Sequence, residues 1–465
     1  MMTPSLSILS DLLSIPSVST DPEFASGMED ARSYLLTLFT SLGFTAHLLP
    51  GRLHPAVFAS YIVNPSHPTV LIYGHYDVQP AGAPSQWTTP AFEPSIRKNR
   101  IYARGATDNK GQFMIHVMAV RKMLESDALP INVKFLIEGE EEIGSPGIEL
   151  LTENYKTLLS ADYLFLSDTE MPALGQPAID ITLRGCLDVE IHIQTSAQDL
   201  HSGQFGGVAP NPAQILAKFL SRLKNGSNKI TLPGFYTDVI SPNDEEIRDF
   251  RKTEPSDTQL LKEGHYFFVG GGENRYSLNR RRWFEPTLDI TGLDSGYTGI
   301  GTKSIIPDTA SAKISIRFVP DQDPEQIYSS LASSLHHSLP KATVWRLIRY
   351  PVASAFKAPT DHPVFELVKS SLKSVFGRPA VFQGQGGSIG SVPVLVRALG
   401  LPAVMIGFGL PDENLHSPNE HFSLENYFKG IETMSRIYSA LPVLHLPNRP
   451  ESIPIILETS SPGLL

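Results

Sequence analysis

Cysteine is almost absent from this chain: Cys186 is the only one in 465 residues. A single cysteine forms no intrachain disulfide and leaves no thiolate set for a structural zinc site. The chain also lacks the run of about 18 apolar residues that a membrane-spanning helix needs. Its N-terminus has no basic stretch followed by an apolar core, which export requires. We therefore predict a cytoplasmic protein with no membrane partner.

Positive charge is also scarce. The chain has 38 Lys and Arg against 48 Asp and Glu, for a formal net charge of −10 at pH 7, and the basic residues are dispersed. Nucleic acids and anionic membrane surfaces attract clustered Lys and Arg. The composition therefore argues against nucleic acid as a partner and favours a small molecule or a peptide.

Short apolar runs alternate with helical patterns along the first part of the chain. A hydrophobic content of 41% over 465 residues exceeds what one ordinary core holds, so we expect two domains. The segment 110–124 has apolar residues at helical spacing. The alternation predicts an α/β fold with a doubly wound, mostly parallel sheet. Its predicted buried strands are Val70–Tyr73, Val133–Ile137, Tyr163–Leu166 and Ala403–Ile406.

The pattern changes near residue 185. Val189, Ile191 and Ile193 alternate as in a half-buried strand, and Asn211-Pro212 begins an amphipathic helix that we expect to reach Leu223. A second strand and helix follow in the same order. This predicts a smaller α+β domain inserted into the larger α/β domain. The expected ranges are 1–184 and 355–465 for the larger domain and 185–354 for the insert, with a Pro- and Ser-rich tail from about 441.

Five scattered segments contain acidic residues and histidines. Four of them follow an apolar run directly, which is where open α/β sheets collect ligand-binding groups. Carboxylates mixed with imidazoles suit Zn²⁺, Mn²⁺ or Co²⁺. Two such ions about 3.5 to 4 Å apart, bridged by a carboxylate and a hydroxide, form a hydrolytic pair. The segments are Tyr73-Gly-His-Tyr-Asp77, Gly105-Ala-Thr-Asp-Asn-Lys110, Glu138-Gly-Glu-Glu-Glu142, Leu166-Ser-Asp168 and Asn414-Leu-His416.

Each residue alone has a simpler interpretation. His75 alone is more typical of a hydrogen-bonded loop histidine, and Asp108 of a helix N-cap. The glutamates at 138–142 alone are typical of a solvated acidic loop. The complete set nevertheless favours a metal-dependent hydrolase, because clustered carboxylates repel one another unless solvent or cations neutralise them.

The same segments resemble a known family, the co-catalytic metallopeptidases that include carnosinase-type dipeptidases, aminoacylase, acetylornithine and succinyl-diaminopimelate deacylases and glutamate carboxypeptidase. The resemblance runs nearly end to end and is nearest to the dipeptidase branch. The motifs that carry it include Gly74-His-Tyr-Asp-Val-Gln-Pro80, Arg104-Gly-Ala-Thr-Asp-Asn-Lys-Gly111, Glu138-Gly-Glu-Glu-Glu-Ile-Gly-Ser145, Asp199-Leu-His-Ser-Gly203, Gly386-Gly-Ser-Ile389 and His416-Ser-Pro-Asn-Glu420.

The resemblance implies a ligand set and catalytic roles. One ion would be held by His75 and Asp168, and the other by Glu142 and His416. Asp108 would bridge the two ions, and the peptide bond that follows Asp108 would be cis. Zinc is the first expectation, with manganese or cobalt as alternatives. Asp77 would orient His75, and Glu141 would be the general base. The larger domain would be the di-metal catalytic domain and the insert a lid and dimerisation domain. His201 would reach the oxyanion from the other subunit of a homodimer formed through this insert.

The resemblance also implies substrate contacts. Arg317 would bind the substrate's carboxylate, beside Gly387 and Ser388. The chain departs from dipeptidase relatives at Glu170 and Gln385, which border the substrate's amino end. The leading hypothesis is thus hydrolysis of dipeptides or short peptides with a free carboxylate. An N-acyl-amino-acid amidohydrolase is the alternative, and a non-catalytic, metal-stabilised peptide-binding dimer is a distant one.

Overall fold

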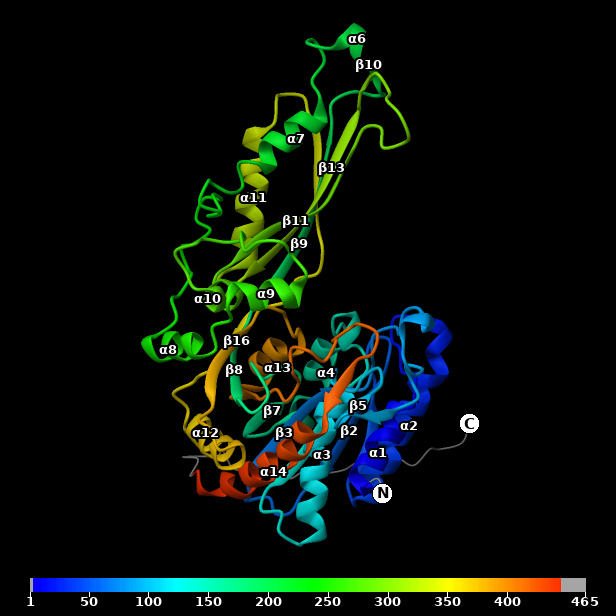
Figure 1. Cartoon of the computed structure of the whole chain (residues 1–465), viewed down its shortest axis with the longest axis vertical. Coiled ribbons are helices and arrows are strands. Elements are labelled where there is room, and N and C mark those ends of the chain that lie inside the picture. Colours follow the sequence, from blue (N-terminus) through cyan, green and yellow to red (C-terminus); the bar gives the residue numbers. More distant parts are fainter. Residues whose placement is uncertain (1–2, 445–465) are drawn as a thin grey trace.

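The computed structural model describes residues 3–444, which form two lobes (Figure 1). The larger lobe is built on a nine-stranded sheet and the smaller on a four-stranded one. The expected tail from about 441 lies almost wholly outside the described residues. None of the described helices is long and apolar enough to cross a membrane.

The nine-stranded sheet is mixed, with parallel pairing at its centre and mainly antiparallel pairing toward its edges. Pairings β6–β3, β3–β7, β7–β17 and β8–β16 are parallel, whereas β1–β2, β2–β6, β17–β8 and β8–β15 are antiparallel. The expected α/β class is confirmed, with parallel pairing concentrated in the strands that lead to the site. In spatial order the strands are β1 (Thr45–Leu49), β2 (Ala56–Tyr61), β6 (Asn132–Glu138), β3 (Thr69–His75), β7 (Tyr163–Leu166), β17 (Ala403–Met405), β8 (Ala178–Leu183) and β15 (Phe356–Lys357), and β16 (Val381–Gln385) pairs with β8.

Helices cover both faces of this sheet. Every residue of β3, β6 and β7 is buried, so neither face of the central strands meets solvent. The helix predicted at 110–124 is α3 (Lys110–Glu125), which packs against α14 (Leu424–Ala440) and α1 (Pro4–Leu13). The other large helices of this lobe are α2 (Ala25–Ser41), α4 (Ile148–Asn154), α12 (Pro363–Phe376) and α13 (Ser391–Leu399).

The smaller lobe has a purely antiparallel sheet with a separate core. Alternate residues of β9 are buried, including Leu187, Val189 and Ile191, and they pack with the helices. Asn211 caps the first helix as the sequence pattern indicates, although this helix ends at Leu220, three residues before the expected Leu223, and Asp323 caps the second helix. The strand order is β11 (Thr287–Ser295), β13 (Thr309–Phe318), β9 (Gly185–Gln194) and β14 (Val344–Arg349), with α7 (Pro212–Leu220) and α11 (Pro324–Ser338).

One part of the expected insert packs on the larger lobe. Phe250, Trp283 and Phe284 belong to the larger lobe's core, and the Phe250 and Phe284 rings lie 4.6 Å apart between centroids. These residues come from α8 (Asp244–Lys252), the end of α10 (Leu278–Trp283) and the residue after it, while α9 (Asp257–Gly264) lies between these helices in the chain. The segment 244–284 thus contributes to the larger lobe's core although it lies within the expected insert, and the boundaries at 185 and 354 stay a prediction.

Candidate metal centre

The five predicted metal ligands lie together at the carboxyl ends of the central parallel strands. His75 is the last residue of β3, and Asp168 follows β7 by two residues. Glu142 lies in the short 3-10 turn after β6. Asp108 precedes α3, and His416 lies in the loop before β18 (His421–Ser423). Because β3, β6 and β7 are adjacent and parallel, their ends meet at one edge of the sheet.

Asp108 lies between two imidazoles. Its Oδ1 is 3.1 Å from His75 Nε2, and its Oδ2 is 2.8 Å from His416 Nε2. His75 Nε2 also lies 3.6 Å from Asp168 Oδ1, and His416 Nε2 lies 3.5 Å from Glu142 Oε2. Two candidate metal-binding groups result, each with one imidazole and two carboxylates, and Asp108 belongs to both.

The chemistry of this donor set fits two divalent cations. His75 Nε2 and Glu142 Oε1 are buried, and neither has a hydrogen-bond partner among the described residues. Unsatisfied buried polar atoms are costly, so their convergence on a shared carboxylate indicates a ligand between them. Imidazole nitrogens and carboxylate oxygens are ligands of Zn²⁺, Mn²⁺ and Co²⁺.

The buried carboxylates of the site also favour the binding of positive charge. Burial and the neighbouring Asp108 carboxylate together raise the pKa of the Glu142 carboxyl to about 7. The pKa of Asp168 is raised chiefly by burial as well. Although burial opposes it, Asp168 and the other carboxylates hold the pKa of His75 well above its usual value. The carboxylates thus favour positive charge here, which either protons or cations can supply.

Asp77 contacts both His75 and the turn that carries the glutamates. His75 Nδ1 lies 3.0 Å from the Asp77 carbonyl oxygen and 3.4 Å from its carboxylate. A carbonyl oxygen only accepts, so Nδ1 is the donor and Nε2 is the nitrogen left for a metal. The Asp77 carboxylate accepts hydrogen bonds from the backbone N–H groups of Glu141 and Glu142, at 3.3 and 3.0 Å.

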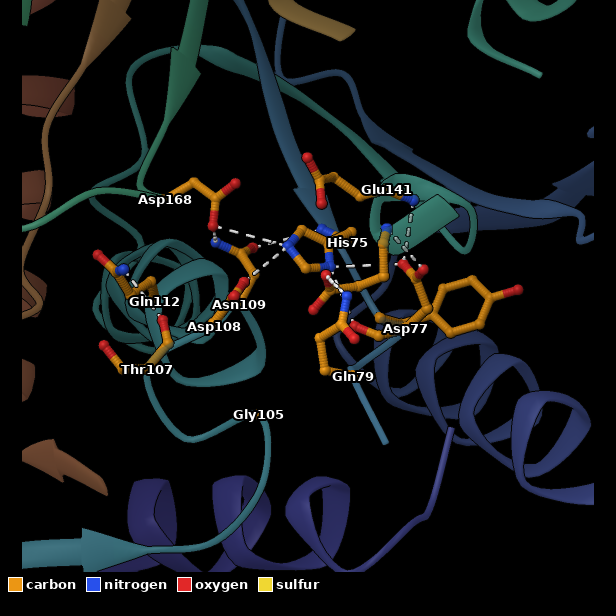
Figure 2. Close-up of polar contacts among 12 residues, drawn as sticks. His75, Asp77, Gln79, Gly105, Thr107, Asp108, Asn109, Gln112, Glu141 and Asp168 are labelled. Atoms are coloured by element: carbon orange, nitrogen blue, oxygen red, sulfur yellow. Dashed lines mark hydrogen bonds and ion pairs between the residues drawn. The ribbon is translucent and has the colours of Figure 1, made fainter. Parts of the chain in front are cut away.

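Glu141 is a buried carboxylate beside the ligands and belongs to neither metal group. Figure 2 shows its side chain extending toward the space between His75 and Asp168. Burial raises the pKa of Glu141 well above its usual value; His75 opposes this rise, and the carboxylates of Asp168 and Asp108 add to it. A carboxylate whose protonated form is favoured in this way is suited to accept a proton.

Several supporting residues escaped the sequence analysis. Asn109, joined to Asp108 by a cis peptide bond, donates to Asp168 Oδ1 at 2.5 Å. Gln79 Nε2 donates to Glu142 Oε2 at 2.8 Å. Glu420 accepts from the Asp108 backbone N–H at 3.1 Å. All three lie within the recognised motifs, but nothing in a motif says which ligand each of them contacts.

Most of the predicted substrate contacts involve the end of β16 and the loop after it. Arg317 Nη1 donates to Ser388 Oγ at 3.0 Å, and Gly387, the residue before Ser388, is exposed. Gln385 Nε2 donates to Asp180 Oδ1 at 2.9 Å. Glu170 and Gln385 line the same pocket, whose volume is about 370 Å³. Their contacts with a substrate stay a prediction.

His201 lies away from the metal ligands of its own chain. It ends the short strand β10 (Leu200–His201), which pairs with β12 (Ile305–Ile306) at the far end of the smaller lobe (Figure 1). Its side chain is exposed, and its Nδ1 accepts a hydrogen bond from the Gly203 N–H at 3.1 Å. Within one chain, His201 therefore does not join the other predicted catalytic residues.

Comparisons with known proteins agree with this geometry. The chain is 32% identical over 448 residues to Cys-Gly metallodipeptidase dug1 of Schizosaccharomyces pombe, covering 91% of this chain and 92% of that one. It is 29% identical to the human Beta-Ala-His dipeptidase over 398 residues, covering 84% and 78%.

Solved structures share the fold. The M20 family metallo-carboxypeptidase Sso-CP2 from Sulfolobus solfataricus is 32% identical with a TM-score of 0.85, covering 95% of this chain and 100% of that one. Human carnosine dipeptidase 1 is 26% identical with a TM-score of 0.77, covering 95% and 96%. The model of Peptidase family M20/M25/M40 matches residues 71–440. The chain therefore belongs to Peptidase family M20/M25/M40, a family of metallopeptidases that use divalent metals, as its motifs predict.

Proposed function

We propose that this metallopeptidase hydrolyses the peptide bond of dipeptides or short peptides that carry a free carboxylate. One observation carries the proposal: the Asp108 carboxylate lies 3.1 Å from His75 and 2.8 Å from His416, and Glu141 is next to this arrangement without joining it. Relatives named as Cys-Gly and Beta-Ala-His dipeptidases support the substrate class.

The two candidate groups would hold two divalent ions, zinc first, with manganese or cobalt as alternatives. His75 and Asp168 would hold one ion, Glu142 and His416 the other, and Asp108 both. When bound, the ions would polarise the scissile carbonyl and lower the pKa of a water molecule.

The chain's own residues would orient the reactants and move the proton. Glu141 would take a proton from the attacking water molecule while the oxygen of that water adds to the carbonyl carbon. It would then deliver that proton to the amine nitrogen as the carbon–nitrogen bond breaks. Asp77 would keep His75 oriented, and Arg317 would hold the substrate's carboxylate through its planar guanidinium.

The substitution Glu141→Gln tests the mechanism. Glutamine keeps the size of the side chain but does not accept a proton, so turnover should fall by at least about 100-fold. Elemental analysis should find the same metal content as in the wild type. Glu149→Gln is the matched control, because Glu149 is 70% exposed on α4. Near-normal turnover in Glu141→Gln would exclude Glu141 as the base.

A substrate panel tests the substrate class. Dipeptides and N-acyl amino acids should be compared with and without a chelator, because an ammonium group needs an acidic partner and an acyl chain needs an apolar pocket. We expect dipeptides to be turned over faster. Faster turnover of N-acyl amino acids would favour the amidohydrolase alternative, and no chelator-sensitive turnover of any amide would favour a non-catalytic binding protein.

We also propose a homodimer formed through the smaller lobe, in the cytoplasm. The exposed position of His201, at the end of that lobe far from its own metal ligands, supports an action on the partner subunit's site. Sedimentation analysis tests the assembly: a monomer with full activity would contradict it.

A further inference from the structure

A buried carboxylate adjoins the pocket that contains Glu170 and Gln385. Asp180 of β8 is 0% exposed, and its Oδ1 accepts hydrogen bonds from Gln383 Nε2 and Gln385 Nε2, both at 2.9 Å. Gln383 is the direct neighbour of Asp180 in the parallel pairing of β16 with β8. Gln385 lies two positions further along β16, on the same face of that strand. Both glutamine side chains therefore reach one carboxylate oxygen.

Asp180 also contacts the segment that follows a predicted metal ligand. Its Oδ2 accepts a hydrogen bond from Thr169 Oγ1, and Thr169 is the residue directly after Asp168. Gln383 Nε2 donates in addition to the Glu170 carbonyl oxygen at 2.6 Å. The Asp180 carboxylate thus ties the carboxyl end of β16 to the chain beside the metal centre.

The hydrogen-bonding character of Asp180 follows from its surroundings. Within residues 3–444 its side chain has one hydroxyl and two amide groups as partners and forms no ion pair. Burial raises the pKa of Asp180 to about 6, and the hydrogen bonds from Thr169, Gln383 and Gln385 oppose this rise. At neutral pH the group is therefore a carboxylate, which only accepts hydrogen bonds. Both glutamines consequently direct their NH₂ groups to it.

This fixed orientation decides which atom of Gln385 remains for a ligand. Nε2 is directed to Asp180, and the Gln385 side chain makes no other hydrogen bond with the described residues. Oε1 is thus the polar atom that Gln385 offers to the pocket it lines, whose volume is about 370 Å³. A carbonyl oxygen accepts hydrogen bonds and donates none. Gln385 is therefore suited to a ligand with an N–H group.

We infer that Asp180 is a positioning residue that fixes the Gln385 amide, and that Gln385 Oε1 accepts a hydrogen bond from the amino group of the substrate. The inference rests on the proposed dipeptidase function. In that function Arg317 holds the substrate's carboxylate, and the peptide bond lies at the metal ligands. The amino group then lies beyond the metal ligands from Arg317, toward the pocket that begins at Glu170, two residues after Asp168.

The test compares alanyl-glycine with propionyl-glycine, which differ only in the amino group. The wild-type enzyme, loaded with zinc or manganese, should have the higher kcat/KM for alanyl-glycine. Gln385→Met keeps the length of the side chain but removes the carbonyl oxygen. The ratio of the two kcat/KM values should fall at least about tenfold in this variant, because hydrogen bonds to charged groups are the stronger ones. The fall should come from alanyl-glycine, while propionyl-glycine changes little.

Two substitutions of Asp180 test the positioning role. Leucine in Asp180→Leu accepts no hydrogen bond, so the Gln385 amide is no longer fixed and the same ratio should fall. In Asp180→Asn the new carbonyl oxygen can accept from both glutamines while its amide donates to Thr169 Oγ1, so the ratio should stay within about twofold of the wild type. A merely structural role for Asp180 would lower the turnover of both substrates in parallel and leave their ratio unchanged.

Gln176→Met is the matched control. Gln176 lines the same pocket, but its Nε2 donates to the carbonyl oxygens of Pro177 and Pro379, and Pro379 precedes β16 whereas Gln385 ends it. The control should keep the wild-type ratio.

An unchanged ratio in Gln385→Met would overturn the inference, even if Asp180→Leu fails to fold, and so would an unchanged ratio in folded Asp180→Leu. Chelator-sensitive turnover of alanyl-glycine would still uphold the proposed function in both cases. Absence of chelator-sensitive turnover of alanyl-glycine and of all other dipeptides would overturn both.

Discussion

Glu420 accepts a hydrogen bond from the backbone N–H of Asp108 at 3.1 Å, although Glu420 belongs to neither candidate metal group. The same carboxylate accepts from the Thr107 N–H at 2.9 Å and pairs with Arg104 at 2.7 Å. Glu420 lies four residues after His416 on one loop. This loop therefore supplies one predicted ligand and also positions the carboxylate that both metal groups share.

Glu420→Gln should weaken both the fold and the metal site. Arg104 and Glu420 are 2% and 0% exposed, so the substitution leaves a buried guanidinium without its counter-charge. Removing one partner of such a pair costs about 3 to 5 kcal/mol, measurable by urea unfolding. Metal titration should show a weaker affinity. In the control Glu432→Gln, whose exposed pair with Lys122 is broken, the loss should stay below about 1 kcal/mol. Unchanged stability and metal affinity in Glu420→Gln would contradict this positioning role.

Divalent metal should stabilise the protein against heat. Cations that bind only the folded chain add about 4 kcal/mol per site at 1,000 times their dissociation constant. Differential scanning calorimetry should therefore show a higher midpoint with zinc or manganese and a lower one after chelation. Glu142→Gln removes a charge from one metal group and should reduce the increase, whereas the exposed control Glu149→Gln should retain it. An equal midpoint with and without metal in the wild type would count against a metal site.

His116 should make stability depend on pH in the acidic range. Burial lowers its pKa to about 3, while its ring contacts Tyr438 Oη at 2.7 Å and Ser167 Oγ at 2.8 Å. Between pH 3 and the usual value near 6.5, the unfolded chain binds a proton that the folded chain does not. The contribution of neutral His116 to the free energy of unfolding is therefore fully present above about pH 6.5 and is lost progressively as the pH falls below that value.

The size of this effect can be isolated with His116→Asn. When the pH falls from 7.5 to 5.5, protonation of His116 in the unfolded chain should lower the free energy of unfolding of the wild type by about 1.4 kcal/mol. The variant lacks this titration, so the stability difference between wild type and variant should shrink by that amount over the same interval. Urea unfolding in excess metal measures it. A difference that does not change with pH would mean that His116 is protonated in the folded chain.

His201→Ala should abolish turnover and be rescued by a second inactive variant. If His201 acts on the partner subunit's site, a mixed dimer of His201→Ala and Glu141→Gln contains one site with both residues intact. When equal amounts of the two variants exchange subunits at random, about a quarter of the wild-type activity should return, because only one of the two sites in each mixed dimer is intact. Activity assays after mixing measure this. No recovery despite subunit exchange would contradict a role across the dimer.

The buried central strands were predictable because their apolar runs are local. The pattern at Val70–Tyr73 corresponds to β3 (Thr69–His75), and the run Tyr163–Leu166 is β7 without change. The ends of such strands also indicated where ligands collect, since α/β sheets bind ligands there. The approximate place of His75 and Asp168 could thus be read from the chain.

Other features depended on long-range packing. Helix α8 carries Phe250 at an amphipathic spacing, but its pattern does not say that the partner is the larger lobe. Arg184 and Arg317 are 133 positions apart in the chain, and only the packing of β13 against the loop after β16 brings both of them to residues 386–388.

The α/β class, the family and the kinds of side chain in the metal groups could be predicted from the chain alone, because periodicity and motifs are local properties. Which atoms meet depends on the packing of distant segments: Asp108 and His416 are 308 residues apart in the chain but 2.8 Å apart in space. Strand order sets these distances, and it results from burying two sheet faces at once, to which residues along the whole chain contribute.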